Sequence, residues 1–150
     1  DKLFKDMLYT EQLDRALAWC KNHGTAEQRA WMGLYLGRSY VKDKLFIPAM
    51  KAYSDALSLA KEKYLYDVAG YICSYMADLY TYTGQRSEER RKFEEAAEFF
   101  KQAGNERSYA FALRDVAKTW AFDDSLSLAL HYMLIADSVI TRFQDLRGIS

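Results

Sequence analysis

This sequence has very little proline, cysteine and histidine, and few glycines. One proline and seven glycines in 150 residues leave no Pro-, Gly- or Ser-rich stretch that would act as a linker, so a single domain is expected. The two cysteines, Cys20 and Cys73, form no CxxC motif, which argues against a disulfide framework. The two histidines, His23 and His131, make neither an HExxH motif nor a Cys/His metal spacing.

Charge of one sign and long apolar runs are also missing. Lys and Arg number 21 and Asp and Glu number 21, so the excess of basic residues typical of a nucleic-acid-binding domain is absent. No uninterrupted run reaches the roughly 18 apolar residues of a membrane span, and the most apolar stretch, residues 126–140, contains His131 and Asp137. No glycine-rich phosphate loop and no strand pattern occur. We therefore expect no membrane, nucleic-acid, cofactor, metal or catalytic site in this domain.

What the sequence does have is an internal period of forty residues. A pattern of large apolar, small, two variable and aromatic residues occurs three times, as Leu36-Gly37-x-x-Tyr40, Met76-Ala77-x-x-Tyr80 and Val116-Ala117-x-x-Trp120. A second pattern keeps the same step, as Ala49-x3-Tyr53-x2-Ala56, Glu89-x3-Phe93-x2-Ala96 and Ala129-x3-Met133-x2-Ala136. Small residues allow helices to approach closely, and apolar residues three or four positions apart line one helix face. Each unit therefore predicts two amphipathic helices joined by a short turn.

Capping residues place the helix boundaries. Thr25-x-x-Gln28 resembles a capping box, Pro48 suits a first helical turn, and Ser87 and Asp124 or Ser125 are expected to cap the helices that follow them. Gly24, Gly84 and Gly104 lie between the periodic segments, where helix ends favour a residue that tolerates positive φ. The expected helices cover residues 6–22, 26–42, 47–63, 66–83, 87–103, 106–121 and 125–143.

The combined pattern resembles the tetratricopeptide repeat, in a long-helix variant similar to those of bacterial sensor and regulator proteins. The resemblance implies an all-α fold, a right-handed α-solenoid of antiparallel helical hairpins. Gly33 and Lys61 depart from the Trp and Pro of the family signature, and Glu89 departs from its small residue. The units are a half repeat over 1–24, repeats over about 25–64, 65–104 and 105–144, and the start of a further repeat over 145–150. We therefore expect a fragment of a longer protein.

The resemblance also implies that the first helix of each hairpin lines a concave surface. The residues expected there include an aromatic row at the forty-residue step and charged neighbours: Trp31, Tyr35, Arg38, Tyr71, Tyr75, Asp78, Tyr82, Phe111, Arg114 and Lys118. Rings supply contact area and charges supply orientation, which suits a peptide ligand. The alternative is that the rings simply pack between helices. The carboxylate clamp of chaperone-binding relatives is not carried over, because Asp115 occupies one of its positions.

Two further segments have simpler interpretations. The charged run 86–98 predicts a solvated helix face with i,i+4 pairs Glu88–Lys92, Arg90–Glu94 and Arg91–Glu95. Cys73 aligns with Gly33 and Leu113 and is expected to be a small buried hydrophobe. The leading hypothesis is a non-catalytic scaffold that binds a protein or peptide, such as the sensory or regulatory domain of a larger bacterial protein. The alternative is a structural or oligomerising solenoid that self-associates through its terminal repeats.

Overall fold

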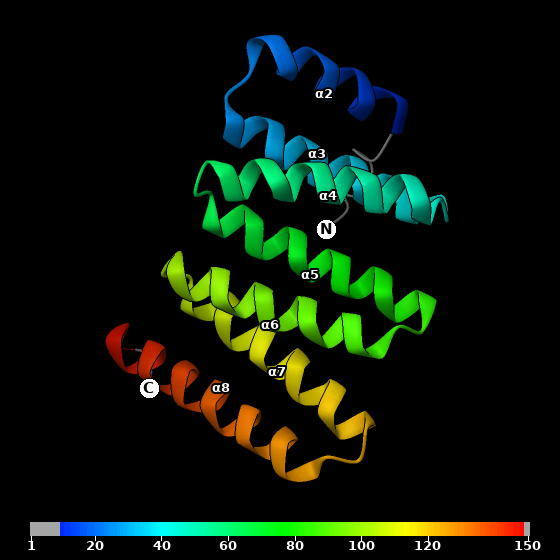
Figure 1. The fold of residues 1–150 in the computed structure, drawn as a ribbon. Coiled ribbons are helices and arrows are strands. Elements are labelled where there is room, and N and C mark those ends of the chain that lie inside the picture. The colour runs from blue at the N-terminus through cyan, green and yellow to red at the C-terminus, as the bar shows by residue number, and fades with distance from the viewer. Residues whose placement is uncertain (1–9, 149–150) are drawn as a thin grey trace.

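The computed structural model describes residues 10–148, which form seven α-helices and no strand. Each helix packs against its neighbours in the chain, and α3 also touches α5, so the hairpins stack in sequence order from α2 to α8 (Figure 1). The all-α stack of hairpins expected from the period is confirmed. The helices are α2 Thr10–His23, α3 Ala26–Lys42, α4 Phe46–Glu62, α5 Tyr66–Thr83, α6 Arg86–Gln102, α7 Glu106–Phe122 and α8 Leu126–Leu146.

The turns show that the forty-residue period consists of two equal halves. Between α3 and α8, one residue in every turn has a left-handed backbone, and these residues are twenty apart: Lys44, Tyr64, Gly84, Gly104 and Asp124, with φ of 56 to 72°. In each turn the N–H of the next residue donates to the carbonyl five residues back, at 2.9–3.0 Å, which is the Schellman closure of a helix end. Gly24, expected to need a positive φ, does not adopt one.

The observed helix starts agree only in part with the capping residues predicted from the sequence. The Thr25 capping box is present, and Pro48 lies in the first turn of α4. Ser87 is not a cap, because α6 already begins at Arg86 after Gln85. Ser125 occupies the N-cap of α8 but its side chain accepts no hydrogen bond there, whereas Asn105 caps α7 by accepting from the Ser108 N–H at 3.1 Å.

Small residues at the forty-residue step hold the helix pairs together. Gly37, Ala77 and Ala117 are buried, as are Ala56, Ala96 and Ala136. Gly33 lies so close to Ala56 that a Cβ at position 33 would come 2.8 Å from the alanine methyl group. Cys73 is fully buried as expected. Its burial, with Glu95 nearby, raises the pKa of the thiol to about 12, so the thiol stays protonated.

The charged run on α6 is solvated only in part, with Arg91, Glu94 and Glu98 exposed. None of the three predicted i,i+4 pairs forms among the described residues; Arg91 pairs with Glu88 and Lys92 with Glu95, each three residues apart. Glu95 also reaches Lys61 on α4 at 2.6 Å, and Lys92 is buried. These charges join α6 to its neighbours because the helix is enclosed on two sides, a feature that charge spacing alone does not reveal.

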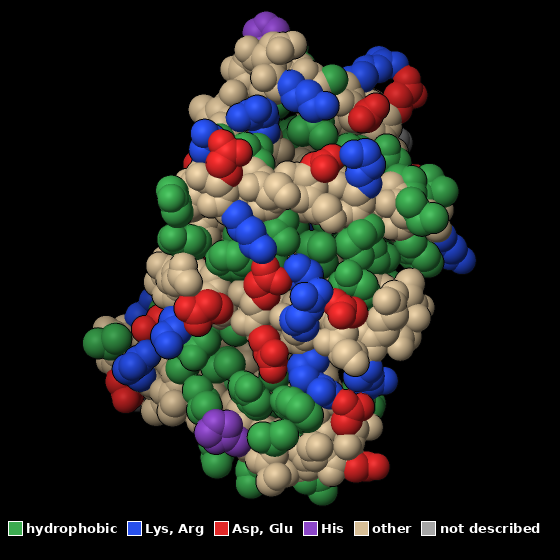
Figure 2. Space-filling model, viewed as in Figure 1, with side chains coloured by type: hydrophobic (Ala, Val, Ile, Leu, Met, Phe, Trp, Pro, Cys, Tyr) green, Lys and Arg blue, Asp and Glu red, His purple; other side chains and the backbone are tan. Residues whose placement is uncertain are grey.

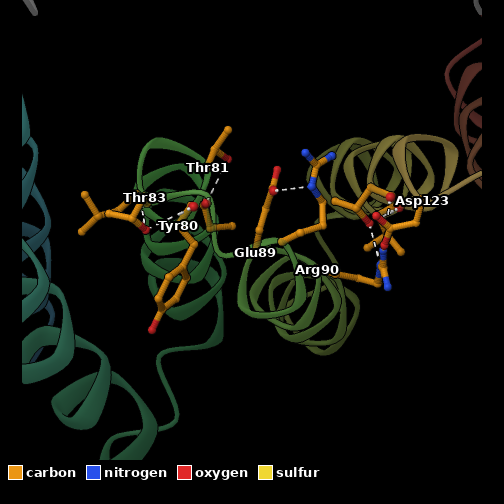
Figure 3. A network of polar contacts seen from close by, with 11 residues as sticks. Tyr80, Thr81, Thr83, Glu89, Arg90 and Asp123 are labelled. Carbon is orange, nitrogen blue, oxygen red and sulfur yellow. Dashed lines mark hydrogen bonds and ion pairs between the residues drawn. The ribbon is translucent and has the colours of Figure 1, made fainter.

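Arg90 on α6 makes a second interhelical contact, to the end of α7. Its guanidinium lies over the Trp120 ring, 3.5 Å from the centroid, and donates to the Thr119 hydroxyl at 2.9 Å and the Thr119 carbonyl at 3.1 Å. It also pairs with Asp123 (Figure 3). The neighbouring Glu89 extends from α6 on the side nearer α5 and pairs with Arg86 (Figure 3). Glu89 thus stays at a helix contact where the other repeats have alanine.

The last helix differs from its equivalents in length and surface. α4 and α6 have 17 residues, whereas α8 has 21, so residues 145 and 146, assigned to the start of a further repeat, belong to α8. Several of its large apolar side chains are exposed: Leu126, Leu128, Leu130, Met133, Leu134 and Leu146. Figure 2 shows hydrophobic side chains at this end of the molecule. By length and composition alone, α8 is the one described helix that could cross a membrane. That is weak evidence, because α8 packs along α7 as the second helix of a hairpin.

Candidate functional site

The residues expected to line the groove all lie on the first helices α3, α5 and α7. They form three rows at the forty-residue step: an aromatic row of Trp31, Tyr71 and Phe111, a second row of Tyr35, Tyr75 and Asp115, and a charged row of Arg38, Asp78 and Lys118. Arg114 lies one turn along from Phe111, and Tyr82 one turn along from Asp78. Equal helix lengths and equal turns bring these rows into line from one hairpin to the next.

The aromatic row divides into a packed part and an exposed part. Trp31 and Tyr71 are half-buried and touch, with 5.7 Å between ring centroids, and Tyr71 meets the edge of Phe100 at 4.9 Å. The Tyr71 hydroxyl lies 3.1 Å from that of Ser108, which connects α5 to α7. Phe111, in contrast, is 47% exposed. The first two rings therefore pack partly between helices, and Phe111 is the most exposed ring of the row.

A hollow of about 870 Å³ opens between the C-terminal halves of α3 and α5. Four of the expected groove residues line it: Arg38, Tyr75, Asp78 and Tyr82. The Arg38 guanidinium lies over the Tyr75 ring at 4.6 Å, which fixes both side chains at the rim. The structure thus gathers residues from two hairpins that are forty positions apart in the chain.

Tyrosine rings form the base and the outer edge of this hollow. Tyr53 on α4 is buried and stacks on Tyr75, with centroids 6.4 Å apart. Tyr82 stacks on Phe46 at 5.9 Å and still exposes 69% of its surface. Lys42 and Thr81 also line the hollow, although the sequence analysis did not select them. Lys42 follows Arg38 by four residues on the same helix face, a spacing that could have identified it.

The electrostatics of the hollow centre on Asp78. Desolvation by the surrounding side chains, and then the carboxylates of Asp115 and Glu89, raise the pKa of Asp78 to about 6, against the opposing effect of Lys118 and Arg38. Burial likewise raises the pKa values of Tyr53 and Tyr75, so both phenols stay neutral. Asp115 is itself paired with Lys118 at 2.8 Å. The hollow therefore combines an aromatic wall with a cation, Arg38, and a carboxyl group, Asp78, that is readily protonated.

Comparison with known proteins supports the architecture. No protein-family model matches this chain, and no curated protein matches it. The fold is similar to that of BtubC (BKLC) from P. vanneervenii, known from a crystal structure, with a TM-score of 0.76 and 13% sequence identity. The similarity covers 90% of this chain and 56% of that one, so this chain spans about half the length of its structural neighbour. At this identity, the likeness shows the helical-repeat fold and nothing more.

The remaining reactive side chains do not gather into a second chemical site. Among residues 10–148, no group of three or more His, Cys, Asp and Glu side chains is placed to hold a metal ion. His23 ends α2, where its Nδ1 lies 3.1 Å from the Trp19 carbonyl and its ring stacks on Trp19. Among the residues expected to line the groove, those around the hollow and the exposed Phe111 are available for recognition.

Proposed function

We propose that this domain is a non-catalytic scaffold that binds a peptide segment of a protein partner along the face formed by α3, α5 and α7. The observation that supports it best is the hollow between α3 and α5, where Arg38, Tyr75, Asp78 and Tyr82 converge. An exposed ring provides apolar contact area, and opposite charges on two helices orient a peptide backbone or side chain. A tetratricopeptide-like relationship and a regulatory role in a larger protein are part of this proposal.

The experiment is a selection of peptides from a random display library on the whole chain, followed by affinity measurements with purified peptides. Tyr82→Ala combined with Asp78→Asn should weaken the selected peptides about tenfold or more, as expected when a hot-spot ring and a charge are removed. Tyr64→Ala is the matched control, since Tyr64 is 74% exposed but lies in the α4–α5 turn. Equal affinity of the double variant and the control would contradict the proposal.

A second candidate function is self-association through α8. Leu126 and Leu130 take the positions of Arg86 and Arg90 on α6, whose guanidinium groups lie over Phe122 and Trp120 of the following helix. On α8 these positions are exposed, at 70% for Leu126 and 59% for Leu130. An apolar face of this kind favours association.

Sedimentation at increasing concentration tests this second function. The unmodified chain should associate, and Leu130→Lys should reduce the association. Ile47→Lys, which also changes an exposed apolar residue, should leave it unchanged. A strictly monomeric chain would exclude this function.

A further inference from the structure

A second cleft lies in the last hairpin, at the end away from the α7–α8 turn, between the start of α7 and the end of α8. It encloses about 320 Å³ and is lined by Glu106, Arg107, Phe111, Ile140, Phe143, Gln144 and Arg147. An adjoining hollow of about 330 Å³ shares Arg107, Phe143 and Arg147 and reaches Asn105, at the N-terminus of α7. We call the two together the Arg–Phe cleft.

The cleft exists because α8 departs from the repeat. α4 and α6 end at Glu62 and Gln102, so a strict period would end α8 at residue 142. The helix instead continues for one more turn, to Leu146. This additional turn, with the residue that caps it, carries Phe143 and Arg147 to the side of Arg107 and Phe111.

Two arginines, Arg107 and Arg147, line the cleft, and Arg114 lies one helical turn from Phe111 on α7; all three have rings as partners. The guanidinium groups of Arg107 and Arg114 each lie 5.8 Å from the Phe111 centroid, and that of Arg147 lies 4.7 Å from the Phe143 centroid. Among the ion pairs of residues 10–148, none involves these three arginines.

Two carboxylates of α7, Glu106 in the lining of the cleft and Asp115 beside Arg114, are already paired with other cations. Glu106 pairs with Arg142 at 3.1 Å, and Asp115 pairs with Lys118 at 2.8 Å. The cleft therefore carries positive charge that the described residues do not neutralise, next to apolar ring surface.

We propose that the Arg–Phe cleft binds an acidic peptide segment in which carboxylates flank a large apolar side chain. This inference rests on the proposed function and gives its partner a chemical class, since Phe111 and Arg114 belong to the same expected groove. Guanidinium groups bind carboxylates in bidentate fashion, and an apolar side chain placed between Phe111 and Phe143 removes ring surface from water. The positive end of the α7 dipole adds to the attraction for an anion.

Calorimetric titration of the whole chain tests the proposal. The probe is a synthetic peptide with blocked ends, Gly-Glu-Glu-Phe-Glu-Glu-Gly, and Arg107→Gln with Arg147→Gln should weaken its binding about tenfold or more, because charge-assisted bonds to two guanidinium groups are lost. Arg91→Gln is the matched control, since Arg91 is exposed and paired with Glu88 on α6. Binding should also weaken as salt is raised. Arg147→Gln alone is the second variant, and circular dichroism checks the fold of each.

The outcomes are distinct. No binding of the probe, equal binding by the double variant and the Arg91→Gln control, or equal affinity for a probe with Phe replaced by Gly would each overturn the proposal. Inorganic phosphate alone binding as tightly as the peptide would also overturn it, since the cleft would then be a simple anion site. If the probe requires the cleft arginines but library peptides ignore Tyr82→Ala with Asp78→Asn, the cleft is supported and the hollow between α3 and α5 is not the peptide site.

Discussion

Gly37 on α3 lies directly against the phenol ring of Tyr53 on α4. A Cβ atom at position 37 would come within 2.5 Å of the Tyr53 Cδ1 atom, well inside van der Waals contact. The equivalent positions hold Ala77 and Ala117, which are buried and accommodate a methyl group. The α3–α4 hairpin therefore packs more closely at this point than its two successors.

Gly37→Ala should accordingly destabilise the chain, although alanine favours a helix more than glycine by about 1 kcal/mol. We expect a net loss of about 1–3 kcal/mol in the free energy of unfolding, because the buried Tyr53 ring must shift in a filled core. Urea denaturation measures the loss, and a double-mutant cycle with Tyr53→Leu isolates its cause. A coupling energy near zero between the two positions would contradict the contact described above.

The forty-residue step predicted much of this packing but little of the turn chemistry. Gly37, Ala77, Ala117 and Cys73 could be assigned to the core because close approach restricts side-chain size. The turns at Lys44, Tyr64 and Asp124 could not, since a left-handed residue was expected only where a glycine is present, and here the hydrogen bonds of the helix end impose that conformation.

Four of the residues that line the hollow were on the predicted concave face, whereas Tyr53, Lys42 and Thr81 were not, and the Arg–Phe cleft was not predicted. Arg38, Tyr75, Asp78 and Tyr82 lie on one face of two equivalent helices, so the period alone brings them together. The cleft depends on the extra turn of α8, which breaks the period. The sequence also left open whether Trp31 and Tyr71 touch each other, because the spacing of rings along helices does not distinguish a groove from a helix interface.

The turns provide a second prediction: substitutions at two equivalent left-handed positions, Lys44 and Gly104, should change the stability in opposite directions. Lys44 has φ of 59°, a conformation that costs a residue with a side chain roughly 1 kcal/mol, so Lys44→Gly should raise the melting temperature. Gly104 has φ of 71°, and no neighbouring atom lies within 4 Å of the place that a Cβ would take. Gly104→Ala should therefore lower stability through backbone strain alone, by about 1 kcal/mol. Thermal unfolding followed by circular dichroism checks both, and shifts of the same sign would refute the turn geometry.

Arg90 and Arg91 are neighbours in sequence and should differ sharply in their response to lysine. Arg90 is mostly buried and combines a ring contact with hydrogen bonds to Thr119, which a lysine cannot reproduce. Arg90→Lys should cost about 1–2 kcal/mol, since buried donors and acceptors lose partners. Arg91 makes an exposed pair within its own helix, so Arg91→Lys should leave the free energy of unfolding nearly unchanged. Denaturant unfolding of the two variants measures the difference, and similar losses would show that the interhelical contact contributes nothing.

Asp78 provides a pH-dependent prediction. Its pKa is raised to about 6 in the folded chain, above the value near 3.9 of an unfolded aspartate, so the folded state holds more protons between these values. Stability from this group is therefore complete below about pH 4 and is lost as the pH rises through 6. Asp78→Asn removes the titration, so the variant should gain stability relative to the unmodified chain as the pH rises from 4 to 7. Melting temperatures of both proteins across this range, with a carbon NMR titration of the Asp78 carboxyl, test the sign. A constant difference in melting temperature, or a carboxyl that titrates near pH 4, would show that neither desolvation nor the carboxylates of Asp115 and Glu89 raise the pKa of Asp78.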